Sequence, residues 1–302
     1  MQKSYEEILL DASISYDEII SRLHMPQYLY KYQCFYSPKM VENKHWRDNL
    51  RGTFHLSLGK EFEDQNDCKP YINKTEVCHS IKKFLSNFGV AQKEIQNILL
   101  GLDNVLTKEY FEGVTSNYQS EIRVGCFTAS SDNNDLWKKY SNDETGYCLE
   151  YKTSKSHLFK HSTLPVLYSD QPYNSSLTLA NALILEAVQQ GKNRTLPDQL
   201  AIYESVYAKI AKTAYVPLFI KEMNKWSFEE EYRLFLLKTR NTSIGLLKAE
   251  DFLDAKANIN LSSAITTIYL GKRFNANANY KILKEEIGCI ANEMGIRVVQ
   301  KQ

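Results

Sequence analysis

The sequence predicts an α+β protein, with a central mixed β-sheet flanked by helices and a helical insertion at about residues 175–224. Short apolar and aromatic runs bounded by turn residues recur along the chain, and runs with helical spacing separate them. No Pro-, Gly- or Ser-rich linker interrupts the 302 residues. We therefore expect a single domain over residues 1–302, with a core at about residues 28–300.

The first half of the chain is expected to contain three helical regions and four strands. Residues 4–24 have an amphipathic pattern that ends before Pro26, a short helix is expected near Lys39–Asp48, and two helices are expected to meet at Gly89 between Glu76 and Leu106. The expected strands are LYKYQ (29–33), TFHLS (53–57), CFTA (126–129) and CLEY (148–151).

The second half repeats this alternation of helix and strand. Residues 176–224 read as a long helical region broken near 191–198, with Pro197 at a helix start, and residues 281–294 read as a further helix. The expected strands are LPVLYS (164–169), EYRLF (231–235), AITTIYLG (264–271) and IRVVQ (296–300). Strands near both ends of the chain predict a mixed sheet that the last strand closes.

Charge and composition exclude several classes of protein. The 37 Lys and Arg residues nearly balance 36 Asp and Glu, so no overall field would draw the protein to a phosphate backbone or an anionic membrane. The N-terminus lacks the pattern of a signal peptide, and residues 177–188 are too few to span a bilayer, so a cytoplasmic location is expected. The six cysteines and six histidines show no metal-ligand spacing; reduced, buried thiols and no metal are expected.

Two polar clusters are candidates for ligand contacts. The first combines Tyr30, Lys31 and Tyr32 on one expected strand with His55 and Ser57 on the neighbouring one. The second, in DLWKKY, is an aromatic pair formed by Trp137 and Tyr140, which lie about one helical turn apart. Each cluster also has a structural interpretation: half-buried strand tyrosines with a surface histidine, and a helix face that packs into the core.

A third cluster follows Trp226 in the segment WSFEEEYRLF. On an extended backbone, Glu229, Glu231 and Arg233 share one face of the strand. Acidic residues entering an apolar strand are costly unless they are solvated, paired with Arg233, or used in a site. The segment therefore predicts either an internal salt bridge or a carboxylate beside a ligand cleft, and we expect Trp137, Tyr140 and Trp226 to surround that one cleft.

Five sequence blocks resemble, in order, those of the bacterial domain-of-unknown-function family 2971, over about residues 28–275. The blocks are LYKY, TFHLSLGKEFED, GCFT with NDLWKKYSNDETGYCLEY, WSFEEEYRLF and ITTIYLGKRF. The chain departs from the family where Phe62-Glu63-Asp64-Gln65 stands in place of Phe-Asn-Asp-Pro.

The block order also resembles the three-part layout of ADP-ribosyltransferases. That resemblance implies that Lys31 or Tyr32, then His55 or Ser57, and finally Glu229 or Glu231 hold NAD as substrate. It implies an ADP-ribosyltransferase or NAD glycohydrolase, of the kind found among bacterial toxins and antiphage effectors. The acceptor would be a protein or a nucleic acid, and a regulatory protein partner is expected.

Carboxylate and aromatic side chains suit the cleavage of NAD. Cleavage of the nicotinamide–ribose bond passes through an oxocarbenium-like state that a carboxylate can stabilise, and the expected catalytic carboxylate is Glu231, or Glu229 if the strand register is shifted by two residues. Trp137 or Tyr140 could stack on a ring of NAD. No GxGxxG fingerprint is present, which argues against a Rossmann crevice and hydride transfer.

Two other functions remain open from the residues. The triplet Glu150-Tyr151-Lys152, preceded by Asp143, is typical of a Mg²⁺-dependent nuclease. Alternatively, the cleft belongs to a non-catalytic recognition domain for a nucleotide or a partner protein, in which Glu229 and Glu231 simply pair with Arg233.

Overall fold

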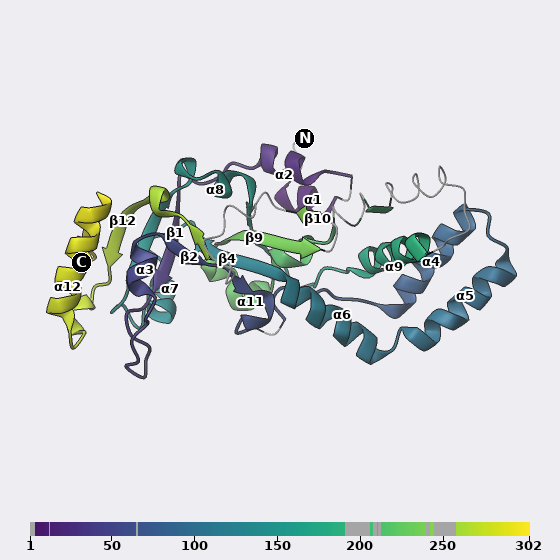
Figure 1. The fold of residues 1–302 in the computed structure, drawn as a ribbon, viewed down its shortest axis with the longest axis horizontal. Helices are drawn as coiled ribbons and strands as arrows, with labels where there is room; N and C mark the ends of the chain where they lie inside the picture. Colours follow the sequence, from purple (N-terminus) through teal and green to yellow (C-terminus); the bar gives the residue numbers. More distant parts are fainter. Residues whose placement is uncertain are drawn as a thin grey trace.

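The computed structural model describes most of the chain, and its elements are arranged around one large sheet (Figure 1). The described residues are 4–11, 13–64, 66–190, 206–207, 210, 213–239, 242–244 and 258–302. Over these residues, no helix combines the length and the apolar character needed to cross a membrane.

A nine-stranded sheet is formed by the described part of the chain, and seven strands follow the order β10-β9-β4-β1-β5-β12-β13. Two short strands join its side, β3 pairing with β4 and β6 with β9. The last strand, β13, runs parallel to β12, whereas the other described pairs in this sheet are antiparallel. The predicted mixed sheet is therefore confirmed. Its strands are β1 (Tyr28–Gln33), β3 (Ser57–Leu58), β4 (Ile122–Thr128), β5 (Tyr147–Lys152), β6 (Thr163–Pro165), β9 (Glu231–Thr239), β10 (Thr242–Ile244), β12 (Ile265–Leu270) and β13 (Arg297–Gln300).

Helices lie around the sheet and extend beyond it on one side. Figure 1 shows α4, α5, α6 and α9 forming an arm to the right of the sheet, with α12 at the opposite end. The helices are α1 (Tyr5–Leu10), α2 (Tyr16–Arg22), α3 (Trp46–Leu50), α4 (Lys74–Asn87), α5 (Gln92–Val105), α6 (Lys108–Glu121), α7 (Asn134–Tyr140), α8 (His157–His161), α9 (Ser176–Gln190), α11 (Met223–Trp226) and α12 (Tyr280–Met294).

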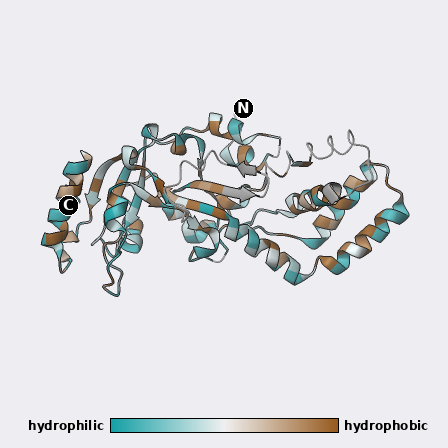
Figure 2. Ribbon diagram, in the orientation of Figure 1, coloured by the Kyte–Doolittle hydropathy of each residue, from teal (hydrophilic) through white to brown (hydrophobic). Residues whose placement is uncertain are grey.

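The main core combines aliphatic and aromatic side chains that pack against the central strands. Phe127, Tyr151 and Phe159 meet edge to face with ring centroids 5.1 to 5.9 Å apart, and Phe54 stacks on Phe127 at 4.7 Å. Figure 2 shows hydrophobic residues along β4 and β9, whereas the helices of the arm alternate hydrophobic and hydrophilic positions. A separate apolar cluster, including Val77 and Ala180, joins α4 to α9 inside the arm.

Most predicted strands are present, but two are divided. Residues 53–57 form β2 (Thr53–His55), which pairs with β11 (Asn258–Asn260), and then β3, which pairs with β4. Residues 164–169 likewise divide between β6, which pairs with β9, and β7 (Leu167–Tyr168), which pairs with β8 (Ile220–Lys221). A single continuous strand was therefore the wrong prediction for both segments, since each half finds a different partner.

The predicted helices are also corrected in several places. Residues 4–24 form two helices, because Ser4 and Ser15 each cap a separate helix start. The helix expected near Lys39–Asp48 begins only at Trp46, after an isolated bridge between Tyr36 and Glu42. Helix α6 was not predicted at all. The two helices around Gly89 are confirmed, and Gly89 has the positive φ of 70° that favours glycine after a helix end.

The region predicted as a helical insertion at residues 175–224 is only partly helical. It opens with α9, whereas the predicted break at 191–198, including Pro197, lies outside the described residues. From Val216 the chain forms a 3₁₀ turn, the short strand β8 and the single-turn helix α11. The prediction that the helical region extends to residue 224 is thus wrong, because a strand interrupts it. The division of the chain into one domain stays a prediction.

Candidate functional site

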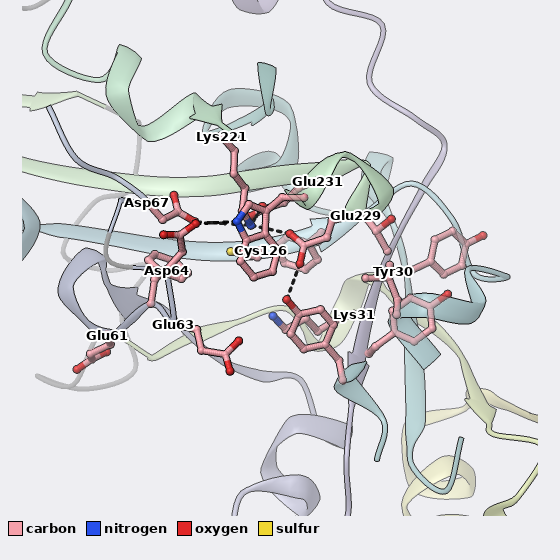
Figure 3. A pocket seen from close by; sticks show the side chains of 17 residues that line it. Tyr30, Lys31, Glu61, Glu63, Asp64, Asp67, Cys126, Lys221, Glu229 and Glu231 are labelled. Atoms are coloured by element: carbon pink, nitrogen blue, oxygen red, sulfur yellow. Dashed lines mark hydrogen bonds and ion pairs between the residues drawn. The ribbon is translucent and has the colours of Figure 1, made fainter. Parts of the chain in front are cut away.

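A cavity of about 200 Å³ opens where β1, β4 and β9 meet α7 (Figure 3). The strand register brings Tyr30, Thr128 and Glu231 side by side on these three strands. In Figure 3, Glu61, Glu63 and Asp64 approach from one side, Lys221, Glu229 and Glu231 from a second, and Tyr30 and Lys31 from a third. The lining residues are Tyr30, Lys31, Tyr32, Glu61, Phe62, Glu63, Asp64, Asp67, Cys126, Phe127, Thr128, Leu136, Tyr140, Lys221, Trp226, Glu229 and Glu231.

Arg233 organises a buried network of charges behind this pocket. Its Nε lies 2.8 Å from Glu231 Oε1, and its two terminal nitrogens each lie 2.7 Å from an oxygen of Asp67. Its side chain is fully buried, and it also donates to the carbonyl oxygen of Leu218 at 2.6 Å. These bidentate, charge-assisted bonds fix Glu231 and Asp67 in position.

Lys221 completes the network from β8. Its Nζ lies 2.6 Å from Glu229, 2.9 Å from Glu231 and 3.6 Å from Asp67. Burial lowers the pKa of this ammonium group, but the carboxylates of Glu231, Asp67 and Glu229 outweigh that effect, so the pKa lies above its usual value. Burial has the opposite effect on the carboxyl group of Glu231 and raises its pKa, but the positive charges of Arg233 and Lys221 outweigh burial and bring this pKa well below the usual range.

Glu229 lies at the boundary between the buried network and the pocket. The sequence predicted Glu229 on a strand, but it lies in a 3₁₀ turn. Glu230 follows with a left-handed φ of 44°, and β9 begins at Glu231. Tyr140 Oη donates to Glu229 Oε1 across the pocket. Burial and the charge of Glu229 raise the pKa of the Tyr140 hydroxyl, so it remains protonated and donates.

Trp226 joins the acidic segment 61–64 to the rest of the site. Its indole Nε1 donates to Asp64 at 2.7 Å, and Lys225 lies 3.4 Å from the same carboxylate oxygen. Burial raises the pKa of Asp64, but hydrogen bonds from Asn66 N, Trp226 and Lys225 lower it below the ordinary value. The Asp64 side chain also accepts a hydrogen bond from the backbone N–H of Asn66 at 3.0 Å, a contact typical of a turn. This contact lies where the sequence departs from Phe-Asn-Asp-Pro.

The predicted residues divide into those that line the pocket and those that support it. Lys31, Tyr32, Tyr140, Glu229 and Glu231 line it together with Trp226. Trp137 does not line it, because its ring is buried, meets Tyr32 edge-on at 5.0 Å and donates from Nε1 to the carbonyl of Ser131. The prediction that Trp137, Tyr140 and Trp226 surround one cleft therefore holds for Tyr140 and Trp226 only.

His55 and Ser57 are not among the residues that line this pocket. His55 is exposed on the β2–β11 ribbon, where Nδ1 lies 3.0 Å from Asn258 Oδ1. Ser57 pairs with Val124 in the sheet. The expectation that either residue contacts a ligand in this pocket is therefore corrected: β2 pairs with β11 and carries His55 out of the large sheet, and Ser57 stays in the sheet on β3 without lining the pocket.

Sequence reasoning missed Lys221, Asp67 and the acidic segment 61–64. The family block that ends in FED offered a signal for the segment, because three acidic residues flank Phe62 and Lys60 is the one basic residue beside them in sequence. Lys221 gave no local signal, since it follows an apolar run and its carboxylate partners Glu229 and Glu231 are eight and ten residues away.

Glu150, the centre of the nuclease interpretation, has a different environment. Thr266 and Thr267 both donate to its Oε1, at 2.6 and 2.8 Å, because a register shift in β12 brings two consecutive side chains to one carboxylate. Tyr269 donates to Oε2 at 3.0 Å. Asp143 instead pairs with Arg273 in an exposed turn. The two carboxylates thus have separate partners, and the described residues contain no group of three or more His, Cys, Asp or Glu placed to hold a metal ion.

A second cavity, of about 820 Å³, lies between helix α6 and the segments around residues 59–72 and 169–173. It shares Phe62, Asp64, Asp67 and Lys221 with the first pocket, so these residues form the wall between the two.

Comparison with known proteins gives a partial assignment. Residues 136–234 match a family described as a protein of unknown function (DUF2971), so the match covers α7 to the first part of β9 rather than residues 28–275. No curated protein and no solved structure matches this chain.

Proposed function

We propose that this chain is an enzyme that cleaves the nicotinamide–ribose bond of NAD, as an ADP-ribosyltransferase or an NAD glycohydrolase, and that Glu229 is its catalytic carboxylate. One observation carries the proposal: Glu229 lines an aromatic and acidic pocket while Lys221 and Tyr140 hold its two oxygens. A carboxylate fixed in this way is available for developing positive charge without reorganisation.

The reaction places a specific demand on this carboxylate. The bond between ribose C1′ and the nicotinamide nitrogen breaks, and its electron pair leaves on that nitrogen, so positive charge develops on the ribose. Water or an acceptor nucleophile then bonds to C1′ and loses its proton to solvent. Glu229 would stabilise the cationic ribose, whereas Glu231, which accepts from both Arg233 and Lys221, supports the position of Lys221.

The pocket lining favours a ligand with a positively charged ring. Among the described lining residues, six carboxylates outnumber two ammonium groups, and Tyr30, Tyr140 and Trp226 add aromatic surface. A volume of about 200 Å³ suits the nicotinamide–ribose half of NAD, because whole drug-sized ligands need roughly 300 Å³ or more. An NAD-consuming activity fits a bacterial toxin or antiphage effector with a protein or nucleic-acid acceptor.

Nicotinamide release from NAD by the purified chain tests the proposal. We expect Glu229→Gln to lower the rate by about two orders of magnitude or more while the protein stays folded, as loss of an electrostatic catalytic group does. Glu230→Gln is the matched control, since this neighbouring side chain is exposed and should leave the rate unchanged. Equal rates for wild type and Glu229→Gln would reject the assignment.

A second candidate, a non-catalytic recognition domain, is favoured by the ion pairs themselves. Glu229 and Glu231 both have a lysine partner within 3 Å without any ligand. In that case calorimetry would detect NAD binding to the wild-type chain, with no nicotinamide released.

A further inference from the structure

The ammonium group of Lys139 lies in a cage of aromatic rings and carboxylates beside the pocket. Its Nζ is 3.7 Å from the centroid of the Trp226 ring, 5.1 Å from that of Tyr140 and 5.9 Å from that of Phe228. Two carboxylate oxygens, from Glu63 and Glu229, lie 3.9 and 4.0 Å from the same nitrogen.

We infer that this cage is a binding site for an organic cation, an alkylammonium or a pyridinium, and that Lys139 occupies it in place of the ligand. The negative faces of aromatic rings attract cations, and such rings in combination recognise quaternary ammonium groups. Nearby carboxylates strengthen the attraction and disfavour anions. A neutral ligand of the same shape gains neither contribution.

The cage is held in place without Lys139. The Trp226 indole is fixed by its hydrogen bond to Asp64, and Phe228 stacks on it with centroids 6.4 Å apart. Asn133, which caps α7, donates to the carbonyl of Phe228 and so ties the helix that carries Tyr140 to the turn that carries Glu229. A ligand would therefore meet a preformed site.

Lys139 is also the lysine most easily displaced from Trp226. Lys221 and Lys225 lie 4.6 and 5.0 Å from the centroid of the ring. Lys221 is held by Glu229 at 2.6 Å and Lys225 by Asp64 at 3.4 Å, and both distances are shorter than those from Lys139 to its two carboxylates. The Lys139 side chain is 30% exposed, and the N···O distances of its two ion pairs, 3.9 and 4.0 Å, are near the longest at which such a pair still counts as a salt bridge. Its ammonium group can move into water while the rings stay in place.

Resting on the proposed function, this inference also specifies which form of NAD the site takes. The oxidised cofactor carries a pyridinium cation, whereas the reduced cofactor carries a neutral ring. The cage would therefore bind the oxidised form more tightly, with the nicotinamide ring in the position of Lys139 and the ribose beside Glu229.

Calorimetry with two small probes tests the inference on the full chain. The probes are 1-methylnicotinamide, a pyridinium cation, and nicotinamide, its neutral counterpart. Lys139→Met removes the competing charge, and we expect it to tighten binding of 1-methylnicotinamide by about fivefold, while nicotinamide affinity stays unchanged. Lys138→Met, the exposed neighbour, is the matched control and should match wild type for both probes.

The outcomes separate this inference from the proposed function. A Lys139→Met variant that is folded by thermal melting but binds the cation no better than Lys138→Met overturns the inference, and so does an equal gain for neutral nicotinamide. Lys139→Gln, which keeps a polar side chain, is the second variant if the first does not fold. If the cation binds more tightly to the variant yet wild type releases no nicotinamide from NAD, the cation site stands and the catalytic proposal falls.

Discussion

The guanidinium of Arg233 lies 2.8 Å from the carboxylate of Glu231, two residues earlier on β9, and both side chains are buried. This pair gives the acidic segment of β9 two different roles. Both glutamates line the pocket and pair with Lys221, but Glu231 also accepts from Arg233, whereas Glu229 also accepts from Tyr140. Substitutions at the two positions should therefore affect different properties.

Glu231→Gln should destabilise the protein. The change leaves Arg233 and Lys221 buried with one carboxylate fewer, and breaking a buried ion pair from one side costs on the order of 3 kcal/mol. Chemical denaturation of wild type and variant measures the loss. Glu230→Gln, on an exposed neighbour, should change the free energy of unfolding by less than about 0.5 kcal/mol. Equal stabilities for the two variants would contradict the structural role of Glu231.

The stability contributed by Glu231 should disappear in acid. Because Arg233 and Lys221 hold its folded-state pKa below the ordinary value of 4.5, the unfolded state takes up a proton first as the pH falls. The contribution is therefore complete above about pH 4.5 and declines below it. Urea denaturation between pH 7 and pH 3 should show the gap between wild type and Glu231→Gln narrowing as the pH falls below 4.5; a constant gap would be inconsistent with this pKa.

Tyr140→Phe should reduce catalysis more than stability. The variant loses the hydroxyl that donates to Glu229, so the carboxylate is held on one side only. We expect nicotinamide release to fall about tenfold, with a loss of about 1 kcal/mol or less in unfolding free energy, since Tyr140 is 39% exposed. Tyr71→Phe, on an exposed tyrosine away from this pocket, serves as the control. An unchanged rate would show that this hydrogen bond does not position Glu229.

Two glycine substitutions should have opposite effects on stability. A Cβ at Gly101, inside α5, meets nothing within 4 Å, so Gly101→Ala should stabilise the protein by roughly 0.5 to 1 kcal/mol through helix propensity. A Cβ at Gly125, in β4, would lie 2.5 Å from the Phe54 ring, and Gly125→Ala should destabilise by about 1 to 3 kcal/mol. Melting temperatures shifted in the same direction would argue against this packing of β2 on β4.

The large strands could be predicted from the sequence because their signals are local. CLEY and EYRLF are short, aromatic and bounded by turns, and both form strands of the central sheet. The division of TFHLS could not be predicted, since it depends on pairing between His55 and Asn258, some two hundred residues apart. Helix α6 was missed because its pattern is weak and none of its residues is buried.

The candidate site could be predicted only in part for the same reason. Glu229, Glu231 and Tyr140 stand in polar blocks that attract notice, and all three line the pocket. Trp137 has the same appearance in sequence but turns into the core, where it packs on Tyr32. No local pattern distinguishes an aromatic residue that faces a cavity from one that faces a strand, so only the tertiary structure separates them.

The strand order also sets limits on how the chain can fold. β1 lies at residues 28–33, yet its neighbours β4 and β5 come about a hundred residues later, and β9 pairs with β4 across a similar interval. Closing such long loops before any pairing is gained makes folding slow and leaves strand edges exposed in the meantime. During synthesis, the early strands must therefore wait unpaired, and the network around Arg233 assembles only after residue 233 has left the ribosome.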